Sequence, residues 1–478
     1  MMPALRRPDV RVAVTLPPRQ ATLAGACDVL VVGGGPAGMG AALGAAAAGA
    51  KTVVVERYGF LGGNATAALV MPLMSFHTEH PQREKLGAHT LLPTDHGPGD
   101  PVIAGAVRSF LARLVAQGGA LAPTLETGFT VPFDPEQFKL IALEMLDEAG
   151  VQFLFHAFAS GVLGEGRPDG VVFETKAGPL VIHARMIVDA TGDGDIAAAA
   201  GAPYEIGREG DGLVQPMTLM FRMADFERAA FKGYLAAHPD QWRGVHGLWD
   251  LIAQATAAGE LDLPREDILF FATPHPREVS VNSTRVAHAV PLLGIDPFDL
   301  SYAEWVSRRQ MRQIVAFLRK YVPGFEQAYL VQSGVQVGVR ETRRIQGDYR
   351  LTGEDVLAAR KFDDVVARST YPIDLHNPAG TGTTLQRLPP GEAYDIPLRC
   401  LLPQGLDNVL TAGRCISGSI EAHSSYRVMP VCMAVGQAAG ACAALAARHG
   451  LPPRRLDPAE VQRELLRQGA NLRELAPR

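Results

Sequence analysis

The sequence predicts an α/β fold in which a Rossmann-like, dinucleotide-binding unit is interrupted by an inserted α+β domain. Three observations predict it. Near the start, an apolar run leads into Gly33, Gly35 and Gly38, and a small-residue helix and a second apolar run ending in Glu56 follow. After residue 204 the pattern changes to short strands and amphipathic helices. Near residue 400 the first pattern returns, so the chain is expected to leave the first unit and come back to it.

The glycine motif has a physical interpretation. Gly33 allows a tight turn, Gly35 lets the backbone approach a pyrophosphate, and Gly38 lets the helix pack closely against the strand. The N-terminus of that helix offers free N–H groups and a partial positive charge to phosphates. Glu56, about 20 residues further on, can accept a hydrogen bond from a ribose hydroxyl. For Arg57, a solvated side chain is favoured over a contact with a 2′-phosphate.

Size and composition restrict the class of protein. The 478 residues are too many for one ordinary core, so two or three structural units are expected. A net charge of −5 gives no reason to expect nucleic acid or an anionic membrane as a partner. The five cysteines include no Cys-x-x-Cys pair, so we expect no metal site and reduced thiols in a cytoplasmic protein. We find no apolar run of spanning length outside the small-residue helices and expect no membrane span.

Domain boundaries follow from the same patterns. Residues 1–25 hold arginines and prolines without a signal-type apolar stretch, so we expect an extended N-terminal arm. Residues 26–204 form the first part of the nucleotide unit, 205–395 the inserted substrate domain, and 396–450 the second part. Residues 451–478 are a polar tail with a peripheral helix.

Individual elements can be predicted in order. A helix is expected over residues 104–117, and Asp134 is expected to cap another helix that ends near Ala149. Residues 171–175 and 180–182 suggest a hairpin, and 184–189 a further buried strand.

A small-residue helix is expected from Val428 to His449 in the second part of the nucleotide unit. Its Gly436 and Gly440 permit close packing, which we expect to be against the sheet rather than against a second membrane helix.

Further segments accompany the glycine motif: Gly59-Phe-Leu-Gly-Gly-Asn-Ala-Thr66, Ala190-Thr-Gly-Asp-Gly194 and Asn408-Val-Leu-Thr-Ala-Gly413-Arg414. With residues 338–345 and 418–440 in the expected order, the chain resembles the FAD-dependent oxidoreductases whose nucleotide domain is like that of glutathione reductase and the fumarate reductase flavoproteins. The resemblance covers nearly the whole sequence. It implies a discontinuous FAD-binding domain and FAD, rather than NAD, as the tightly held cofactor.

The resemblance also implies which residues lie at the cofactor. Gly62 and its neighbours would form a loop under the ribityl chain and flavin ring, and Gly413 would return the chain to the flavin. The helix after Val428 would point its N-terminus at the pyrimidine edge of the ring, where it would stabilise negative charge. The residues implied are Gly33, Gly35, Pro36, Ala37, Gly38, Glu56, Arg57, Gly62, Gly63, Asn64, Thr66, Ala157, Thr191, Gly192, Asp193, Gly413, Arg414 and Val428.

Some of these residues have structural alternatives. Thr66 can cap the turn that follows it. Asp193 and Asp195 can cap a helix over residues 196–200, and this alternative stays open against a cofactor contact. The related fumarate reductase loop carries a histidine before its glycine pair, whereas residues 56–61 have none, which argues against that mode of covalent flavin attachment.

Candidate catalytic residues lie in polar clusters near the cofactor segments. A base is needed near the leaving proton, and histidine has a suitable pKa. His423 and Tyr426 rank first because they lie between the returning strand and the last long helix; His77 and His376 follow, and a structural role is open for each. Arg340 is a candidate clamp for a substrate carboxylate, although a solvated helix face is slightly favoured.

The predicted function is an FAD-dependent oxidoreductase of the dehydrogenase or oxidase type, which transfers a hydride between a small organic molecule and the flavin. One alternative is a monooxygenase that uses NAD(P)H and oxygen. Another is an FAD-binding electron-transfer module without its own substrate. The electron acceptor and a homo-oligomeric state are left open by the sequence.

Overall fold

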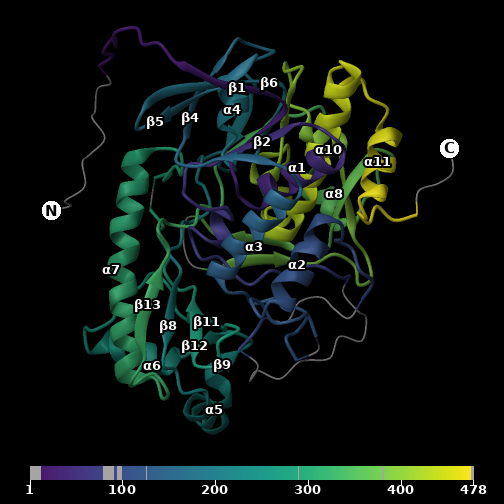
Figure 1. Cartoon of the computed structure of the whole chain (residues 1–478). Coiled ribbons are helices and arrows are strands. Elements are labelled where there is room, and N and C mark those ends of the chain that lie inside the picture. Colours follow the sequence, from purple (N-terminus) through teal and green to yellow (C-terminus); the bar gives the residue numbers. More distant parts are fainter. Residues whose placement is uncertain are drawn as a thin grey trace.

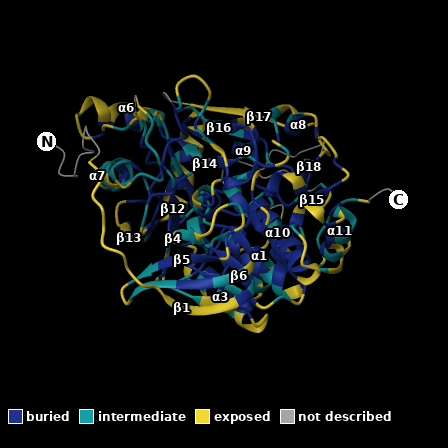
Figure 2. Ribbon diagram, turned by 90° about the horizontal axis from the view of Figure 1, so that it is seen from above, coloured by how far each residue is buried: buried dark blue, intermediate teal, exposed yellow. Residues whose placement is uncertain are grey.

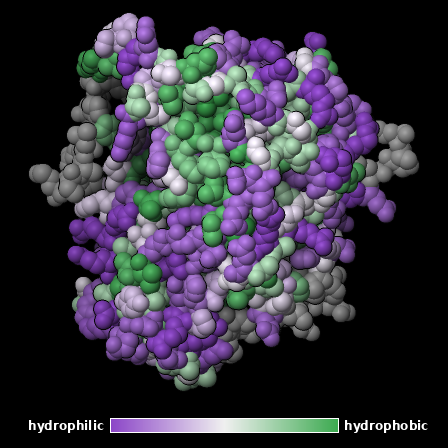
Figure 3. Space-filling model, viewed as in Figure 1, coloured by the Kyte–Doolittle hydropathy of each residue, from purple (hydrophilic) through white to green (hydrophobic). Residues whose placement is uncertain are grey.

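The computed structural model describes residues 12–78, 91–93, 99–124, 126–288, 290–378 and 382–474. Figure 1 shows an upper part built on a large sheet and a lower part built on a second sheet, with the long helix α7 (Pro297–Tyr321) along one side. On the face drawn in Figure 3, apolar side chains gather mainly over the upper part, and much of the lower part is hydrophilic.

The large sheet has the strand order β3-β2-β1-β6-β5-β4, with β19 also paired to β6. Its strands are β1 (Thr22–Val32), β2 (Thr52–Val55), β3 (Gln152–Leu154), β4 (Phe158–Leu163), β5 (Gly170–Thr175), β6 (Gly178–Asp189) and β19 (Val409–Thr411). Strands β3, β2, β1, β6 and β19 are parallel, while β5 is antiparallel to both β4 and β6. The return of β19 to β6 brings the C-terminal segment back to the first sheet.

Two sequence expectations differ in detail from this sheet. Strand β1 begins at Thr22, so residues 22–25, which were expected in the arm, belong to the sheet. Of the arm, residues 1–11 lie outside the described residues, and 12–21 are exposed and without regular structure. The hairpin after Gly170 is confirmed, but its second strand and the buried strand expected at 184–189 are one continuous strand, β6.

Helices α1 (Pro36–Ala47) and α10 (Met429–His449) cross closely beneath the sheet. A Cβ on Gly436 would overlap the carbonyl oxygen of Ala37, and one on Gly440 would overlap that of Ala41. These glycines therefore serve contact between two helices and not, as the sequence suggested, contact between a helix and the sheet. Figure 2 shows both helices in the buried centre of the molecule.

Helix α10 is long and apolar enough to cross a membrane, and it is the one such helix within the part of the chain that the structure describes. Its most apolar window is 89% buried inside the protein. The core therefore takes up the apolar surface of α10.

The second sheet is antiparallel, in the order β13-β8-β12-β11-β10-β9. Its elements are β8 (Phe221–Ala224), β9 (Trp242–Arg243), β10 (His246–Gly247), β11 (Ile268–Ala272), β12 (Glu278–Val281) and β13 (Tyr329–Ser333), with helices α5 (Arg228–Ala237) and α6 (Trp249–Ala257). Its aromatic-rich core includes Phe226, Phe231 and Phe270, which pack around Phe325. This core is separate from that of the large sheet.

The last part of the predicted insertion packs elsewhere. Its elements are α8 (Gly353–Leu357), β15 (Val365–Ser369), β16 (Ile373–His376), β17 (Thr383–Gln386) and β18 (Tyr394–Pro397). Apolar residues such as Val365 and Ile373 share one core with α10 rather than with the second sheet. This last segment therefore packs with the unit of the large sheet, although the boundary of the insertion was expected at residue 395.

The remaining elements connect these parts. They are α2 (Ala106–Ala116), α3 (Pro135–Glu148), α4 (Asp195–Ala199), α9 (Ile420–Tyr426), α11 (Pro458–Arg467), β7 (Tyr204–Ile206) and β14 (Arg343–Ile345). The predicted cap of α3 is confirmed, because the Asp134 carboxylate accepts hydrogen bonds from the backbone N–H groups of Glu136 and Gln137.

Candidate functional site

A groove begins at the glycine turn where β1 ends. Gly33 has a φ of 101°, and a Cβ there would lie 2.5 Å from the carbonyl oxygen of Ala190. A Cβ on Gly38 would overlap the carbonyl oxygen of Gly33, so Gly38 sets the packing of α1 and does not line the groove. Gly35, Pro36 and Ala37 line it instead. The first N–H groups of α1 therefore lie at the groove wall, in the position that suits phosphate.

Glu56 closes one end of this groove. Its carboxylate accepts hydrogen bonds from Gly34 N at 2.6 Å and from Tyr58 N at 3.0 Å. Burial raises the pKa of this carboxyl, against the lowering effect of those hydrogen bonds. Arg57 also lines the groove, but its guanidinium donates to Gln336 Oε1 at 2.8 Å and so is tied to the lower part of the molecule.

The loop after β2 forms the floor of the groove. Gly62 has a φ of 109° and Gly63 a φ of 50°, and a Cβ on Gly63 would lie 2.8 Å from Gly35 Cα. Asn64 Nδ2 donates to the carbonyl oxygen of Val339 at 3.2 Å. Thr66 is buried outside the groove and donates to Leu61 O at 2.7 Å, so it closes the turn before it and not, as the alternative expected, the turn that follows.

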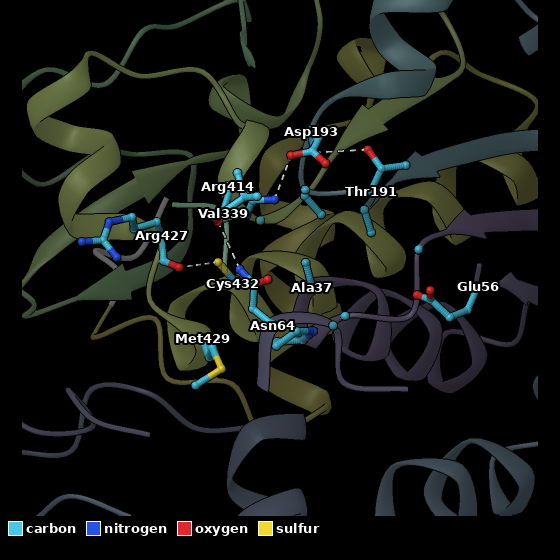
Figure 4. A pocket seen from close by; sticks show the side chains of 18 of the residues that line it. Ala37, Glu56, Asn64, Thr191, Asp193, Val339, Arg414, Arg427, Met429 and Cys432 are labelled. Carbon is cyan, nitrogen blue, oxygen red and sulfur yellow. Dashed lines mark hydrogen bonds and ion pairs between the residues drawn. The ribbon is translucent and has the colours of Figure 1, made fainter. Parts of the chain in front are cut away.

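The segment after β6 forms the opposite wall, where Thr191, Gly192 and Asp193 line the groove with Gly413 and Arg414. Asp193 Oδ1 accepts from Arg414 Nη2 at 2.9 Å. Figure 4 shows this pair between Glu56 at one end of the groove and Arg427 and Met429 at the other.

The open alternative for Asp193 and Asp195 is wrong, because another carboxylate caps α4. Asp189 Oδ2 accepts from Ile196 N at 2.8 Å and from Ala197 N at 2.9 Å. Asp195 instead pairs with Arg343 Nη1 at 2.8 Å.

Three more of the expected cofactor residues lie outside the groove lining. Gly62 lies in the loop beneath it, and Ala157 is buried beside the backbone of Glu56. Val428 lies in the wall of a second cavity, which adjoins the groove.

This second cavity has a volume of about 500 Å³ and lies between the two sheets and the β16–β17 hairpin. Five residues line both the cavity and the groove: Asn64, Val339, Arg414, Arg427 and Met429. The two spaces therefore meet at this shared wall. Sites at such junctions between structural units are common in enzymes.

Two predicted catalytic residues, His376 and Arg340, line the cavity. The Arg340 guanidinium donates to Pro216 O at 2.5 Å and to Thr218 Oγ1 at 2.6 Å, so Arg340 is not on a solvated helix face. Burial, aided by the charge of Arg427, lowers the pKa of Arg340 to about 9.

His376 lies on β16 with Nε2 3.7 Å from Asp374 Oδ2 and Nδ1 3.1 Å from Thr383 Oγ1. Burial and the charges of Arg340 and Arg427 lower the pKa of the imidazole well below its ordinary value. A neutral imidazole that faces a cavity can accept a proton.

The structure does not place the first-ranked pair, His423 and Tyr426, at either space. Both are buried in α9, and the Tyr426 hydroxyl donates to Ile416 O at 2.8 Å. Burial lowers the pKa of His423 and raises that of Tyr426, each far from its ordinary value. Both side chains lie on the face of α9 that packs into the core, so their surroundings are those of structural residues.

His77 is also outside both spaces. Its ring packs edge-on against Phe129, with 5.7 Å between the centroids, and burial lowers its pKa.

Sequence reasoning missed Arg427, which follows Tyr426 directly and lies in the shared wall. It also missed Tyr58 and Gln336, which line the groove. A sequence signal existed for Arg427 alone, because it stands in the same polar cluster as His423 and Tyr426, directly before the small-residue helix.

All five cysteines are buried and free. Burial raises the pKa of the Cys415 thiol well above its ordinary value, which disfavours the reactive thiolate form. Over the described ranges, no cluster of three or more His, Cys, Asp or Glu side chains could hold a metal ion.

Comparison with known proteins gives one family. A family model described as FAD dependent oxidoreductase matches residues 28–465. No curated protein sequence matches the chain.

Several solved structures are similar in overall arrangement. A geranylgeranyl bacteriochlorophyll reductase-like protein from Thermoplasma acidophilum is 13% identical, with 93% of this chain and 84% of that chain covered and a TM-score of 0.43. The flavin-dependent brominase Bmp2 is 12% identical, with 92% and 83% covered and a TM-score of 0.45. The p-nitrophenol 4-monooxygenase PnpA from Pseudomonas putida DLL-E4 is 12% identical, with 92% and 85% covered and a TM-score of 0.44. Similarity at this level does not bear on the reaction.

Proposed function

Because the chain belongs to the FAD dependent oxidoreductase family, with FAD as its cofactor, we propose that it transfers a hydride between FAD in the groove and a small organic molecule in the adjoining cavity. The observation that carries this proposal is the wall of five residues common to the two spaces. A substrate held in the cavity would lie next to the end of the groove that is farthest from Glu56.

The residues of the groove fit FAD. The glycine turn and the first turn of α1 provide backbone N–H groups for a pyrophosphate, and Glu56 lies where a ribose hydroxyl can donate to it. Arg414 Nη1 is buried and has no hydrogen-bond partner among the residues that the structure describes. An acceptor on the cofactor would satisfy this donor, whose burial is otherwise costly.

When bound, FAD supplies the acceptance and donation of electrons. The chain supplies binding, orientation and a site for the proton. We assign the proton to His376, because it is the predicted histidine that faces the cavity and its environment keeps it neutral. Thr383 holds the ring through Nδ1. Arg340 and Arg427 orient the substrate.

The test is to mix the FAD-loaded protein anaerobically with a panel of small metabolites. Reduction of the flavin is measured as the loss of its absorbance, that is, as bleaching. Bleaching by a member of the panel, without NAD(P)H, supports the proposal. If dithionite bleaches the flavin but no metabolite does, the protein is a carrier; if NAD(P)H is required together with oxygen, it is a monooxygenase.

A pair of matched variants locates the substrate. Leu385 lies in the cavity wall on β17, so Leu385→Trp should fill part of the cavity and slow bleaching while FAD content stays the same. Leu330→Trp, on the exposed edge strand β13, should leave the rate unchanged. An equal effect of both substitutions would argue against this cavity.

A further inference from the structure

The cavity lining carries an excess of positive charge. Arg340, Arg387, Arg414 and Arg427 line it, and Asp374 is the one acidic lining residue in the described part of the chain. Arg414 is paired with Asp193, and Arg427 lies 3.5 Å from Asp374. Among the described residues of the wall, these pairs leave Arg340 and Arg387 without an ion pair of their own, and Asp374 offsets the charge of Arg340 only in part.

Arg340 is the more informative of the two, since Arg387 is exposed. Arg340 donates to two neutral acceptors, Pro216 O and Thr218 Oγ1. Burying a charge without an opposite charge is costly, and the cost falls when an anion binds beside it. Arg427 adds to this, because its Nε is buried and lacks a hydrogen-bond partner within the described ranges.

The pKa shifts of neighbouring groups agree with an excess of positive charge. Burial is the main cause that lowers the pKa of Arg340 and of His376. The guanidinium of Arg427 adds to the shift of Arg340, and those of Arg340, Arg427, Arg285 and Arg265 add to that of His376. Asp374 opposes this effect for Arg340 without reversing it.

Much of the remaining cavity wall is apolar, although the polar residues Asn64, Thr218, His246, Asn282 and Tyr371 also line it. Met71, Met74, Met220, Leu269 and Phe271 line it. Methionine side chains adapt to irregular apolar shapes, and a volume of about 500 Å³ is within the range of sites that enclose a drug-sized molecule. A short, doubly charged acid would leave most of this surface without a partner.

We propose that the cavity binds an organic monoanion, with its carboxylate on Arg340 and Arg427 and an aromatic or medium-length aliphatic body against the methionine-lined wall. This inference rests on the proposed function, because it names the class of substrate for the same cavity. Carboxylate and guanidinium form two parallel hydrogen bonds, which fixes the orientation of the acid relative to the shared wall.

The test is titration calorimetry on the oxidised, FAD-loaded protein with pairs of ligands that differ only in charge. Phenylacetate is compared with phenylacetamide, hexanoate with hexanamide, and succinate serves as a short dianion. At least one monoanion should bind about tenfold or more tightly than its amide, as expected for a charge-assisted hydrogen bond. Succinate should bind more weakly than that monoanion.

Variants assign the effect to Arg340. Arg340→Gln should remove the preference for acid over amide, Arg340→Lys should retain part of it, and amide binding should be unchanged in both. Arg312→Gln changes net charge equally at an exposed position on α7 and should have no effect. FAD content and melting temperature show whether each variant is folded, and Arg340→Lys keeps the assignment testable if Arg340→Gln does not fold.

Amides that bind as tightly as their acids, a panel in which no acid binds, or tightest binding by succinate would each overturn the inference. Calorimetry requires no turnover, so its result is independent of the bleaching experiment. If acids bind but no member of the metabolite panel bleaches the flavin, the proposed function fails and the anion site stands.

Discussion

At the scale of single residues, the assignment of His376 as the base gives the most direct test of the proposed chemistry. Burial comes first among the causes that lower its pKa, and the charges of Arg340 and Arg427 follow. A base acts only while it is unprotonated, so a lowered pKa moves the acid limb of the rate profile to lower pH. The value of kcat/KM for flavin reduction should therefore stay level from about pH 8 to about pH 6.5, where an ordinary histidine titrates.

Substitution separates this role from a structural one. His376→Asn should lower the rate of flavin reduction by about 100-fold or more, the usual contribution of a general base. Thr383→Val removes the hydrogen bond to Nδ1 and should reduce the rate less, with the pH profile still level. An acid limb with its midpoint near pH 6.5 in the wild-type protein would contradict the assignment.

The residue scale also shows what could be predicted from sequence. Glu56 and the glycine turn were predictable because a local motif fixes both their conformation and their place in the fold. Arg340 and His376 meet only in the folded chain, through β16 and the segment before β14. No local sequence pattern shows that the charge of Arg340 acts on the pKa of His376.

At the scale of elements, the contact between α1 and α10 determines the position of the helix that faces the groove. A Cβ on Gly436 would overlap the carbonyl oxygen of Ala37, which lines the groove. Gly436→Ala should therefore lower stability by about 3 kcal/mol through overpacking, and it should also weaken FAD binding because α1 has to shift. Thermal melting and FAD content measure the two effects.

Gly233 on α5 provides the matched control. A Cβ there meets nothing within 4 Å, so Gly233→Ala should raise stability by about 0.5 kcal/mol through helix propensity alone. If the two substitutions had the same effect, helix propensity and not interhelical contact would explain both.

Helix α9 shows why the first-ranked catalytic pair lies away from both the groove and the cavity. The sequence placed His423 and Tyr426 correctly between the returning strand and α10, but order along the chain does not decide which face of a short helix is buried. The core takes up those two side chains, and Arg427, one residue later, lies in the cavity wall. Rotation about the helix axis is set by tertiary packing.

At the scale of the whole molecule, one buried ionic network joins α3 of the upper part to the sheet of the lower part. Asp134 Oδ2 lies 2.8 Å from His275 Nε2 and 3.3 Å from Arg222 Nη2, and Arg222 also makes a bidentate pair with Glu278. Because Asp134 also caps α3, one carboxylate stabilises a helix and the contact between the two parts.

The pKa of Asp134 gives this network a predictable dependence on pH. Burial alone would raise that pKa, but the hydrogen bond from His275, the backbone N–H groups and the charge of Arg222 together hold it below its ordinary value. A carboxyl with a lowered folded-state pKa adds stability above its unfolded pKa, and this added stability is lost as pH falls through the folded-state pKa. The melting temperature should therefore fall on acidification below about pH 4.

Substitution tests the role of this carboxylate. Asp134→Asn should lower stability at pH 7 by about 3 kcal/mol and flatten the dependence of the melting temperature on acid pH. Glu227→Gln, at the similar cap of α5, should cost less because the Glu227 side chain accepts one hydrogen bond, from Ala229 N, within the residues that the structure describes. An Asp134→Asn variant that melts like wild type at pH 7 would mean that the two parts are held together by apolar packing alone.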